Sequence, residues 1–473
     1  MKKIVSLVFL LGLLYAGMAQ TLVSRTLIRS FTKAQLDSVL GANGIPSLFV
    51  TTQYGIDVYK VTYNSFDFDS SAVVESGLLA IPQNVDCKLP LVSYQHGSMS
   101  RKEDAPSRLN GAEPLISCIL ASNGYVGLAP DYIGLGDCPG IHRYQHALTE
   151  AMSVIDLIRA ARESCDSLGV KLNGQVFLGG YSEGGHATMA AFKTIQEKLD
   201  NEMHVTAAAP MSGAYDMSGV MVDVMLSNNT YPSPSYVAYL VASWNPVYQM
   251  YDSLSEALVH PYDSLLPIWF NGTKGLGYID SHMPSVPKLI FKPDTIDAFA
   301  ADTNHVFRRA LRDNDLWNWL PQSPVRMLFC GNDHYVSPDN SRKAYARMME
   351  LGCTMCDTVN VNPTYDHQEC AQFAILGAKY FMDSFAIFDC SNGIVDINWS
   401  NISLYPNPAT QVVSIRNLPA AATSVKILAA DGQLVYDAKP TGTIQIANLP
   451  AGVYTLLLSG NDSKQKALRF IKQ

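Results

Sequence analysis

Short apolar runs alternate with helix-like stretches through the middle of the chain. The apolar runs lie at residues 89–94, 125–129, 175–179, 205–210, 325–330 and 358–361. The helix-like stretches lie at residues 114–123, 146–165, 184–198, 339–351 and 369–385. Short apolar strands that alternate with helices are typical of a parallel sheet covered on both faces. The pattern therefore predicts an α/β fold.

A long insertion, residues 214–321, separates two of these predicted strands. It carries four of the five tryptophans, many tyrosines and an almost wholly apolar stretch at residues 236–248. A sheet core does not need an insertion of this size between two strands. We interpret it as a cap over the carboxyl edge of the sheet, where α/β proteins bind ligands. The alternative is a packing subdomain with no role in binding.

The tail of the chain has a different period. From residue 403 the apolar runs are short and alternating, and Asp431-Gly432 between two of them is a hairpin signal. About 70 residues of this pattern predict a small antiparallel β-sandwich at 403–473. We expect a linker at 390–402 and one α/β domain at 20–389.

The first residues have the pattern of a targeting segment. Lys2 and Lys3 precede an apolar run at residues 4–15, and Gly17 and Ala19 are small residues where a signal peptidase cuts. We therefore expect a signal peptide at 1–19; a membrane anchor is the alternative, although the run is short for a bilayer. No later stretch has 18 uncharged apolar residues in a row, so we expect no transmembrane segment in the mature protein.

Composition excludes several classes. The 473 residues are 48% hydrophobic and 16% charged, with a mean hydropathy of +0.05, which argues against intrinsic disorder. A net charge of −8 argues against a nucleic-acid partner. Nine cysteines are an odd number, so at least one is unpaired or pairs between chains, and the spacing does not fix the pairing.

We expect neither a metal nor a redox role for the cysteines. Cys353-x-x-Cys356 follows a predicted helix, whereas a redox motif would sit at a helix start, and a structural zinc would need a second ligand pair. The chemistry identified below needs no cofactor.

The strongest chemical signal is Gly180-Tyr181-Ser182-Glu183-Gly184, a G-x-S-x-G motif. It follows an apolar run and opens a helix, which is the strand–turn–helix setting of a nucleophile elbow. The glycines matter because a serine on so sharp a turn leaves no room for side chains beside it. The helix start adds donors and a positive dipole end for a developing oxyanion.

A serine needs a base to take its proton, and an elbow expects the chain order serine, acid, histidine. Asp333 follows the strand predicted at 325–330, and His367 follows the next strand. Both would lie on loops at the carboxyl edge of the sheet, as Ser182 does. His334 is a rival base, and Asp339 and Asp366 are rival acids. We interpret His186, one turn into the elbow helix, as packing or polar support.

An oxyanion hole needs two backbone donors. One is expected at the N–H of Glu183, the residue after the nucleophile. The second is expected in the loop after residues 89–94, at Gly97 or Ser98, where the glycine permits a close backbone approach. A tight turn with no catalytic role is the alternative for this loop.

Residues 90–387 resemble an α/β-hydrolase of the secretory lipase kind. The resemblance rests on Tyr94-Gln95-His96-Gly97, Pro130-Asp131-Tyr132-x-Gly134-x-Gly136, the elbow motif, Asn314-Asp315-x-x-x-Trp319-x-Pro321 and Gly331-Asn332-Asp333. It implies acyl-ester hydrolysis, with Ser182, Asp333 and His367 at the matching positions.

The tail resembles the C-terminal sorting domain of the type IX secretion system. Its marks are Tyr405-Pro406-Asn407-Pro408, Gly452-Val453-Tyr454 and Arg469-Phe470-Ile471-Lys472. This implies a partner, the type IX machinery, and a Bacteroidetes-type protein that is secreted or held at the cell surface, with the tail usually removed.

Two other functions stay open beside a serine esterase or lipase. A serine peptidase on the same fold would need groups that read a peptide terminus, for which Glu183 and the pair Arg308-Arg309 are candidates. A non-catalytic surface binding protein would be expected to carry a broken triad, whereas here all three candidate residues are present.

Overall fold

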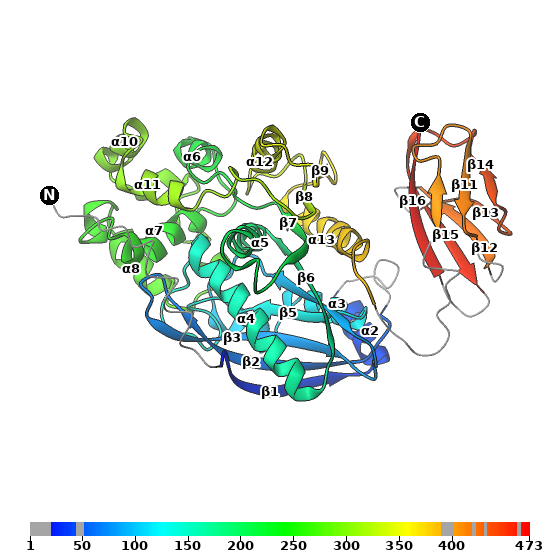
Figure 1. Ribbon diagram of the computed structural model, residues 1–473. Helices are drawn as coiled ribbons and strands as arrows, with labels where there is room; N and C mark the ends of the chain where they lie inside the picture. The colour runs from blue at the N-terminus through cyan, green and yellow to red at the C-terminus, as the bar shows by residue number, and fades with distance from the viewer. Residues whose placement is uncertain (1–19, 44–51, 389–401, 419–421, 430–432, 461–464) are drawn as a thin grey trace. The chain divides into compact units, whose positions relative to one another are not determined.

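The computed structural model describes residues 20–43, 52–388, 402–418, 422–429, 433–460 and 465–473. The signal peptide predicted at 1–19 and most of the linker predicted at 390–402 lie outside these residues. The chain divides into two compact units, which meet in the sequence at residue 390 (Figure 1). Each unit is described by itself.

The first unit is built on a nine-stranded mixed sheet. The strand order is β1-β2-β3-β5-β4-β6-β7-β8-β9, and the pairs from β5 through β4 to β9 are parallel. The strands are β1 (Leu22–Phe31), β2 (Ile56–Phe66), β3 (Ala72–Pro82), β4 (Leu89–Gln95), β5 (Val126–Pro130), β6 (Leu172–Tyr181), β7 (Val205–Met211), β8 (Val325–Phe329) and β9 (Cys356–Asn360).

The antiparallel end of the sheet adds to the sequence analysis, which predicts a parallel sheet and names no strands before residue 89. β1, β2 and β3 pair in antiparallel fashion, and β3 pairs with β5 in the same way. β1 is an edge strand with one fully buried residue, Phe31, so it carries little of the apolar pattern that marks a strand. Antiparallel strands of this kind need only a short turn between them, here residues 67–71, rather than a helix.

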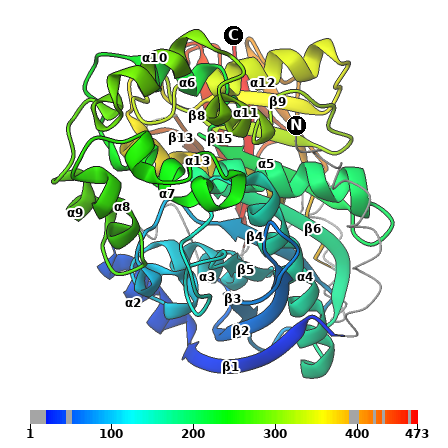
Figure 2. The ribbon, with the colours of Figure 1, turned by 90° about the vertical axis from the view of Figure 1, so that its left-hand side faces the viewer.

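Two helical layers cover the sheet. The helices α4 (Ala147–Leu168), α5 (Glu183–Thr194) and α12 (Asp339–Glu350) share one buried core with it. On the opposite face lie α3 (Glu113–Ser122) and α13 (His367–Asp383), and Figure 2 shows α3 and α4 on either side of the sheet strands. A further helix, α2 (Lys33–Ala42), packs beside α3.

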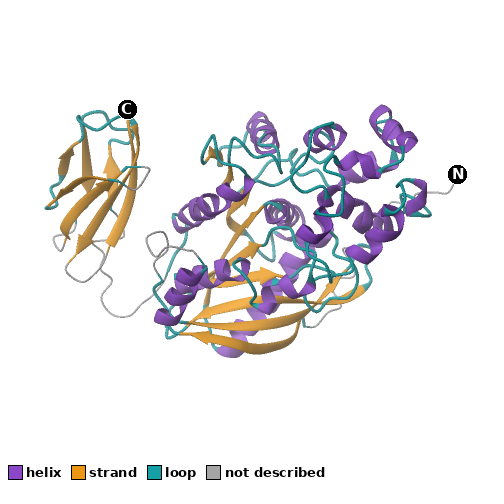
Figure 3. Cartoon of the chain, turned by 180° about the vertical axis from the view of Figure 1, so that it is seen from behind, coloured by secondary structure: helices purple, strands orange, loops and turns teal. Residues whose placement is uncertain are grey.

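The insertion between β7 and β8 forms a helical layer with a core of its own. It holds α6 (Val220–Leu226), α7 (Ser235–Tyr248), α8 (Tyr262–Trp269), α9 (Leu276–Asp280), α10 (Pro293–Ala301) and α11 (Val306–Asp313) (Figure 3). Leu316 and Trp319, which the sequence analysis assigns to the insertion, instead pack into the sheet core, where Trp319 meets Phe192 edge to face. The separate core of the insertion therefore ends near α11.

The second unit is a small antiparallel sandwich. One sheet contains β10 (Ser403–Tyr405), β11 (Val412–Arg416) and β14 (Thr443–Gln445). The other contains β13 (Leu434–Ala438), β12 (Ala422–Leu428), β15 (Gly452–Gly460) and β16 (Gln465–Lys472). Alternate side chains from both sheets form one apolar core.

The register of the parallel strands brings three loops together. Gln95 at the end of β4 pairs with Gly180 near the end of β6, and Tyr181 pairs with Met211 at the end of β7. The loops that follow β4, β6 and β7 therefore leave the sheet side by side at its carboxyl edge. Within the described residues, we find no helix that is both long and apolar enough to cross a membrane.

Candidate active site

Ser182 occupies a sharp turn between β6 and α5. Its backbone has φ 62° and ψ −121°, a strained conformation for a residue with a side chain. The glycines around it are required by space. A Cβ on Gly184 would overlap the carbonyl oxygen of Gln95, and a Cβ on Gly185 would overlap that of Met211. The local geometry is that of the predicted nucleophile elbow.

One line of hydrogen bonds joins Ser182, His367 and Asp333. Nε2 of His367 lies 2.9 Å from Oγ of Ser182, and Nδ1 of the same ring lies 2.6 Å from Oδ2 of Asp333. The second carboxylate oxygen of Asp333 accepts the backbone N–H groups of Tyr335 and Val336, both at 2.9 Å. All three side chains are buried. The structure thus brings together the serine, acid and base that the sequence analysis selects.

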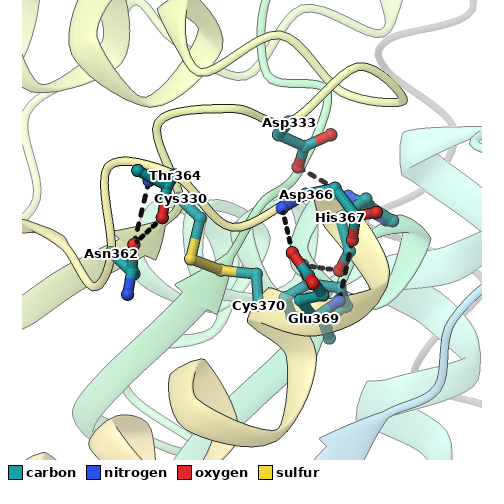
Figure 4. Close-up of a disulfide and its surroundings, with 9 residues drawn as sticks. Cys330, Asp333, Asn362, Thr364, Asp366, His367, Glu369 and Cys370 are labelled. Carbon is teal, nitrogen blue, oxygen red and sulfur yellow. Dashed lines mark hydrogen bonds and ion pairs between the residues drawn. A yellow bond between two sulfur atoms is a disulfide. The ribbon is translucent and has the colours of Figure 1, made fainter.

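The alternative base and acids named in the sequence analysis do not take part in this line of hydrogen bonds. His334 is exposed, and Asp339 pairs with Arg342 at the start of α12. Asp366 caps α13: its side chain accepts the N–H of Glu369, and the Glu369 side chain accepts the N–H of Asp366. His367 is the first residue of α13, so this capping box fixes the backbone that carries the imidazole (Figure 4).

The imidazole of His367 is held from several sides. The ring of Tyr335 stacks on it with centroids 5.1 Å apart, and the ring of Tyr181 lies 4.9 Å away at a tilt. The Tyr181 hydroxyl also donates to the backbone carbonyl of His367 at 2.6 Å. These contacts fix the direction in which Nε2 faces Ser182.

A disulfide ties the loop of Asp333 to the helix that begins at His367. Cys330 and Cys370 are bonded, and each stands three residues from Asp333 or His367 (Figure 4). A second disulfide joins Cys353 to Cys356, and it closes the short turn between α12 and β9. Cys118, Cys138 and Cys165 are free and buried. The spacing of the cysteines could not predict this pairing.

The loop after β4 lies against the nucleophile. A Cβ placed on Gly97 would be 3.9 Å from Cβ of Ser182, which is ordinary contact. The carboxyl of Glu113, at the start of α3, lies beside Gly97, since the same Cβ would be 3.6 Å from its Oε1. Burial raises the pKa of Glu113 above its usual range. The sequence analysis predicts Gly97 and Ser98 near Ser182 but not the role of Glu113 in holding them.

Two tyrosines cover this loop, Tyr144 from the segment before α4 and Tyr239 from the insertion. The hydroxyl of Tyr144 lies 3.0 Å from Oγ of Ser98, and the ring of Tyr144 stacks on Tyr239 of α7 at 4.6 Å. The Tyr239 hydroxyl donates to the carbonyl of Met99 at 3.1 Å. The loop after β4 is therefore bonded both to the sheet domain and to the helical insertion.

Two buried histidine–glutamate pairs lie beneath the elbow. Nε2 of His142 is 2.6 Å from Oε1 of Glu183, and Nδ1 of His186 is 2.6 Å from Oε2 of Glu150. The other nitrogen of each ring faces a backbone carbonyl, at Ile133 and Asn314. Burial lowers the pKa of each histidine, but the neighbouring carboxylate outweighs it and leaves both pKa values raised. His186 is therefore a buried, hydrogen-bonded residue of the elbow helix, in keeping with the supporting role expected for it.

The groups suggested for reading a peptide terminus do not meet at Ser182. The Glu183 side chain is fully buried and faces His142 rather than the solvent. Arg308 lies over the ring of Phe299 in the core region of the insertion. In the described part of the chain, no three His, Cys, Asp or Glu side chains gather as a metal site requires.

Two families match separate parts of the chain. Residues 101–232 match the secretory lipase family, and residues 403–473 match the secretion system C-terminal sorting domain. A search of the curated proteins found no match. The second match indicates delivery by the type IX secretion machinery and an extracellular or cell-surface location.

Solved structures match the first unit over almost its whole length. A putative hydrolase from Legionella pneumophila is 26% identical, with a TM-score of 0.71 over 77% of this chain and 98% of its own. The rice cell wall degrading esterase LipA from Xanthomonas oryzae is 27% identical, with a TM-score of 0.67 over 76% and 96%. Candida antarctica lipase A, at 16% identity and TM-score 0.59 over 77% and 81%, shares the fold. Together these matches confirm the α/β-hydrolase fold and the resemblance to secretory lipases, and they support a carboxylic ester hydrolase.

Proposed function

We propose that this carboxylic ester hydrolase works through a covalent acyl-enzyme, with Ser182 as nucleophile, His367 as general base and Asp333 as the residue that orients His367. The observation that carries the proposal is the unbroken line from Asp333 through His367 to Ser182, at 2.6 and 2.9 Å. Such a line allows a serine hydroxyl to lose its proton as it attacks.

The reaction has two halves. In the first, Oγ of Ser182 attacks the ester carbonyl carbon while Nε2 of His367 takes the hydroxyl proton. The tetrahedral intermediate then breaks its bond to the alcohol oxygen, and His367 gives that oxygen the proton. In the second half, a water attacks the acyl-enzyme, His367 takes its proton, and the acid leaves as Ser182 recovers the proton.

The negative charge on the tetrahedral oxygen requires two backbone donors. We assign one to the N–H of Glu183, the residue after the nucleophile. The loop after β4 supplies the other. We assign this second donor to the N–H of Ser98, because Gly97 lies beside the Glu113 carboxyl and allows the loop to approach Ser182 closely.

The rings around the site support an ester with an apolar acyl or aryl group. Tyr335 and Tyr236 are half-buried beside the triad and the loop after β4, and their centroids lie 6.3 Å apart. The Xanthomonas esterase in the comparison degrades rice cell walls, which makes esters of plant or microbial polymers a reasonable class to test.

The proposal includes the route of export. A signal peptide at 1–19 would take the chain across the inner membrane, and the sandwich at 403–473 would direct it to type IX secretion. We propose that the sandwich is then removed, and that the hydrolase is released or stays at the cell surface. Mass spectrometry of the secreted protein would show both cleavage sites, and a first residue other than one near Gln20 would contradict the signal peptide.

The deciding experiment is a rate profile on p-nitrophenyl esters from acetyl to palmitoyl, beside a panel of dipeptidyl p-nitroanilides. Ester turnover that disappears in Ser182→Ala supports the proposal, and the best chain length sizes the acyl site. Ser255→Ala is the control, since Ser255 is an exposed serine of the insertion with no place in the proposed site. Faster anilide turnover would support a peptidase instead, and ester activity that survives in Ser182→Ala would refute the nucleophile.

A further inference from the structure

An apolar cavity of about 270 Å³ lies between α3 and α13, on the opposite face of the sheet from α5. We call it the α3–α13 cavity. Residues of both helices line it. Its described lining does not include Ser182, Asp333 or His367, so it is a second site rather than part of the triad.

The walls of the α3–α13 cavity suit a hydrocarbon. Ile116 of α3 faces it from one side, and Ile375 and Leu376 of α13 face it from the other, all three only half-buried. Ile119 and Met382 add buried apolar surface. Half-buried side chains of this kind still expose apolar area that a bound alkyl chain would remove from water, at about 25 cal/mol for each Å².

The inner end of the cavity is polar, and two of its polar atoms can accept or donate a further hydrogen bond. The hydroxyl of Tyr94 lies against the carboxyl of Glu113. Even so, neither this hydroxyl nor Oε2 of Glu113 has a well-formed hydrogen bond to any described residue, although both atoms are buried. Tyr94 itself is only 2% exposed. Buried polar atoms without partners are uncommon and mark a place for a ligand's polar group.

The outer end differs from the inner end. Gln372 is exposed there, and Lys379 is already paired with Asp383 at 2.6 Å. Among the described residues that line the cavity there is therefore no unpaired cation for a carboxylate head group. A charged head would also be costly beside the buried Glu113 carboxyl. The free hydrogen-bonding atoms are at the inner end, and they suit an uncharged oxygen.

We propose that the α3–α13 cavity binds a straight-chain primary alcohol of about ten carbons, since an apolar cavity of about 150 Å³ holds a six-carbon ring. The hydroxyl lies at Tyr94 and Glu113, and the alkyl chain lies between Ile116 and Ile375. Alcohols with long chains are also products of ester hydrolysis. The binding itself does not depend on the proposed catalytic roles, so either inference can fail while the other holds.

The test is calorimetric titration of the full mature protein with 1-octanol, 1-decanol and 1-dodecanol. Each buried CH₂ contributes about 0.8 kcal/mol, or a factor of about four, so 1-decanol should bind about fifteenfold more tightly than 1-octanol. The gain from 1-decanol to 1-dodecanol should be smaller because the cavity is full. Decanoate at pH 8 should bind more weakly than 1-decanol. No saturable binding, or tighter binding of decanoate, would overturn the proposal.

Variants locate the binding. Ile375→Trp fills the cavity and should weaken 1-decanol binding at least tenfold. Tyr380→Trp is the matched control, since Tyr380 is exposed on the same helix and does not line the cavity; it should leave the affinity unchanged. Tyr94→Phe removes one hydrogen bond to the alcohol and should weaken binding about three- to tenfold.

A folding control keeps the result decisive. If Ile375→Trp fails to fold, Ile116→Trp closes the cavity from the α3 side and is measured in its place. Affinity for 1-decanol that survives a folded cavity-filling variant would place the alcohol elsewhere and refute the site.

Discussion

The two loops that flank Ser182 are held by different means. The base side, Asp333 and His367, is fixed by a disulfide, a capping box and two tyrosine rings. The oxyanion side, Gly97 and Ser98, has no covalent tie: the Tyr144 hydroxyl lies 3.0 Å from Oγ of Ser98, and the Glu113 carboxyl lies beside Gly97. The first set of contacts is partly covalent, and Tyr335 in it also accepts a hydrogen bond from Tyr231 of the insertion at 2.7 Å. The second set has no covalent tie and joins residues from α3 and from the segment before α4.

This difference fits the demands that the proposed reaction places on each side. His367 must move a proton four times in one cycle, so its direction must not change, and a covalent tie limits its movement. The oxyanion donors act only when charge develops, and their loop is bonded to Tyr239 of the insertion through Met99. The insertion contacts both sides, but only the base side has a covalent tie that resists a shift.

The largest expected effect tests the base side. Asp333→Asn should lower kcat on a p-nitrophenyl ester by about 10⁴, because the amide no longer holds the imidazole in the tautomer that accepts the serine proton. Asp366→Asn is the matched control next to His367, and asparagine is an equally good helix cap. It should change kcat by no more than about twofold. Equal losses in the two variants would mean that Asp333 is not the orienting acid.

The disulfide gives the next largest effect. Removing it with Cys330→Ser and Cys370→Ser should lower the free energy of unfolding by about 4 kcal/mol, since the bond closes a loop of 40 residues. The same change at Cys353 and Cys356 should cost about 2 kcal/mol in the chain-entropy account. Urea unfolding measures both values.

Kinetics separates a positioning role of the disulfide from a stabilising one. Below the unfolding transition, the variant without Cys330–Cys370 should lose kcat at unchanged KM, because the loops of Asp333 and His367 are no longer tied. The variant without Cys353–Cys356 should keep its kcat. If both variants keep full kcat, the first disulfide stabilises the fold without positioning the triad.

The oxyanion side should respond more weakly. Tyr144→Phe removes the hydroxyl beside Oγ of Ser98 and should lower kcat by about two- to tenfold, the range of one hydrogen bond. Tyr248→Phe is the control, since its hydroxyl bonds the side chain of Asn314 away from this loop. A Tyr144→Phe loss as large as that of Asp333→Asn would remove the contrast between the two sides.

The sequence predicts most of the site because its signals are local. The glycines next to Ser182 can be recognised in the sequence, and they are required because the backbone of Gln95 and Met211 leaves no space for a Cβ. Asp333 and His367 each follow a strand of the same parallel sheet. Because neighbouring strands of a parallel sheet run in the same direction, their carboxyl ends lie at one edge of the sheet. The fold class follows from the same alternation of strands and helices.

The rest depends on contacts between distant residues. Glu113 and Gly97 meet only because α3 folds back on the loop after β4, and His142 reaches Glu183 across 41 residues. The cysteine pairing could not be chosen among the alternatives that nine residues allow. The polar edge strand β1 has too little apolar pattern to be recognised.

The smallest predicted effect concerns the pH dependence of stability on the oxyanion side. Burial raises the pKa of Glu113 in the folded protein above its value in the unfolded chain, about 4.3. Between these two values the folded state keeps a proton that the unfolded state has lost, so stability falls as the pH rises through this window.

Glu113→Gln should remove this fall. Glutamine keeps an oxygen that can accept the Gly97 N–H, and it has no proton to lose. Its melting temperature relative to wild type should therefore rise from pH 4 upward and level off once the folded carboxyl has ionised. Glu103→Gln, at a mostly exposed carboxyl, should show no such trend. If the difference in melting temperature between Glu113→Gln and wild type does not change with pH, the Glu113 carboxyl does not lie in a low-dielectric environment beside Gly97. The loop after β4 would then be held by Tyr144 and Tyr239 alone.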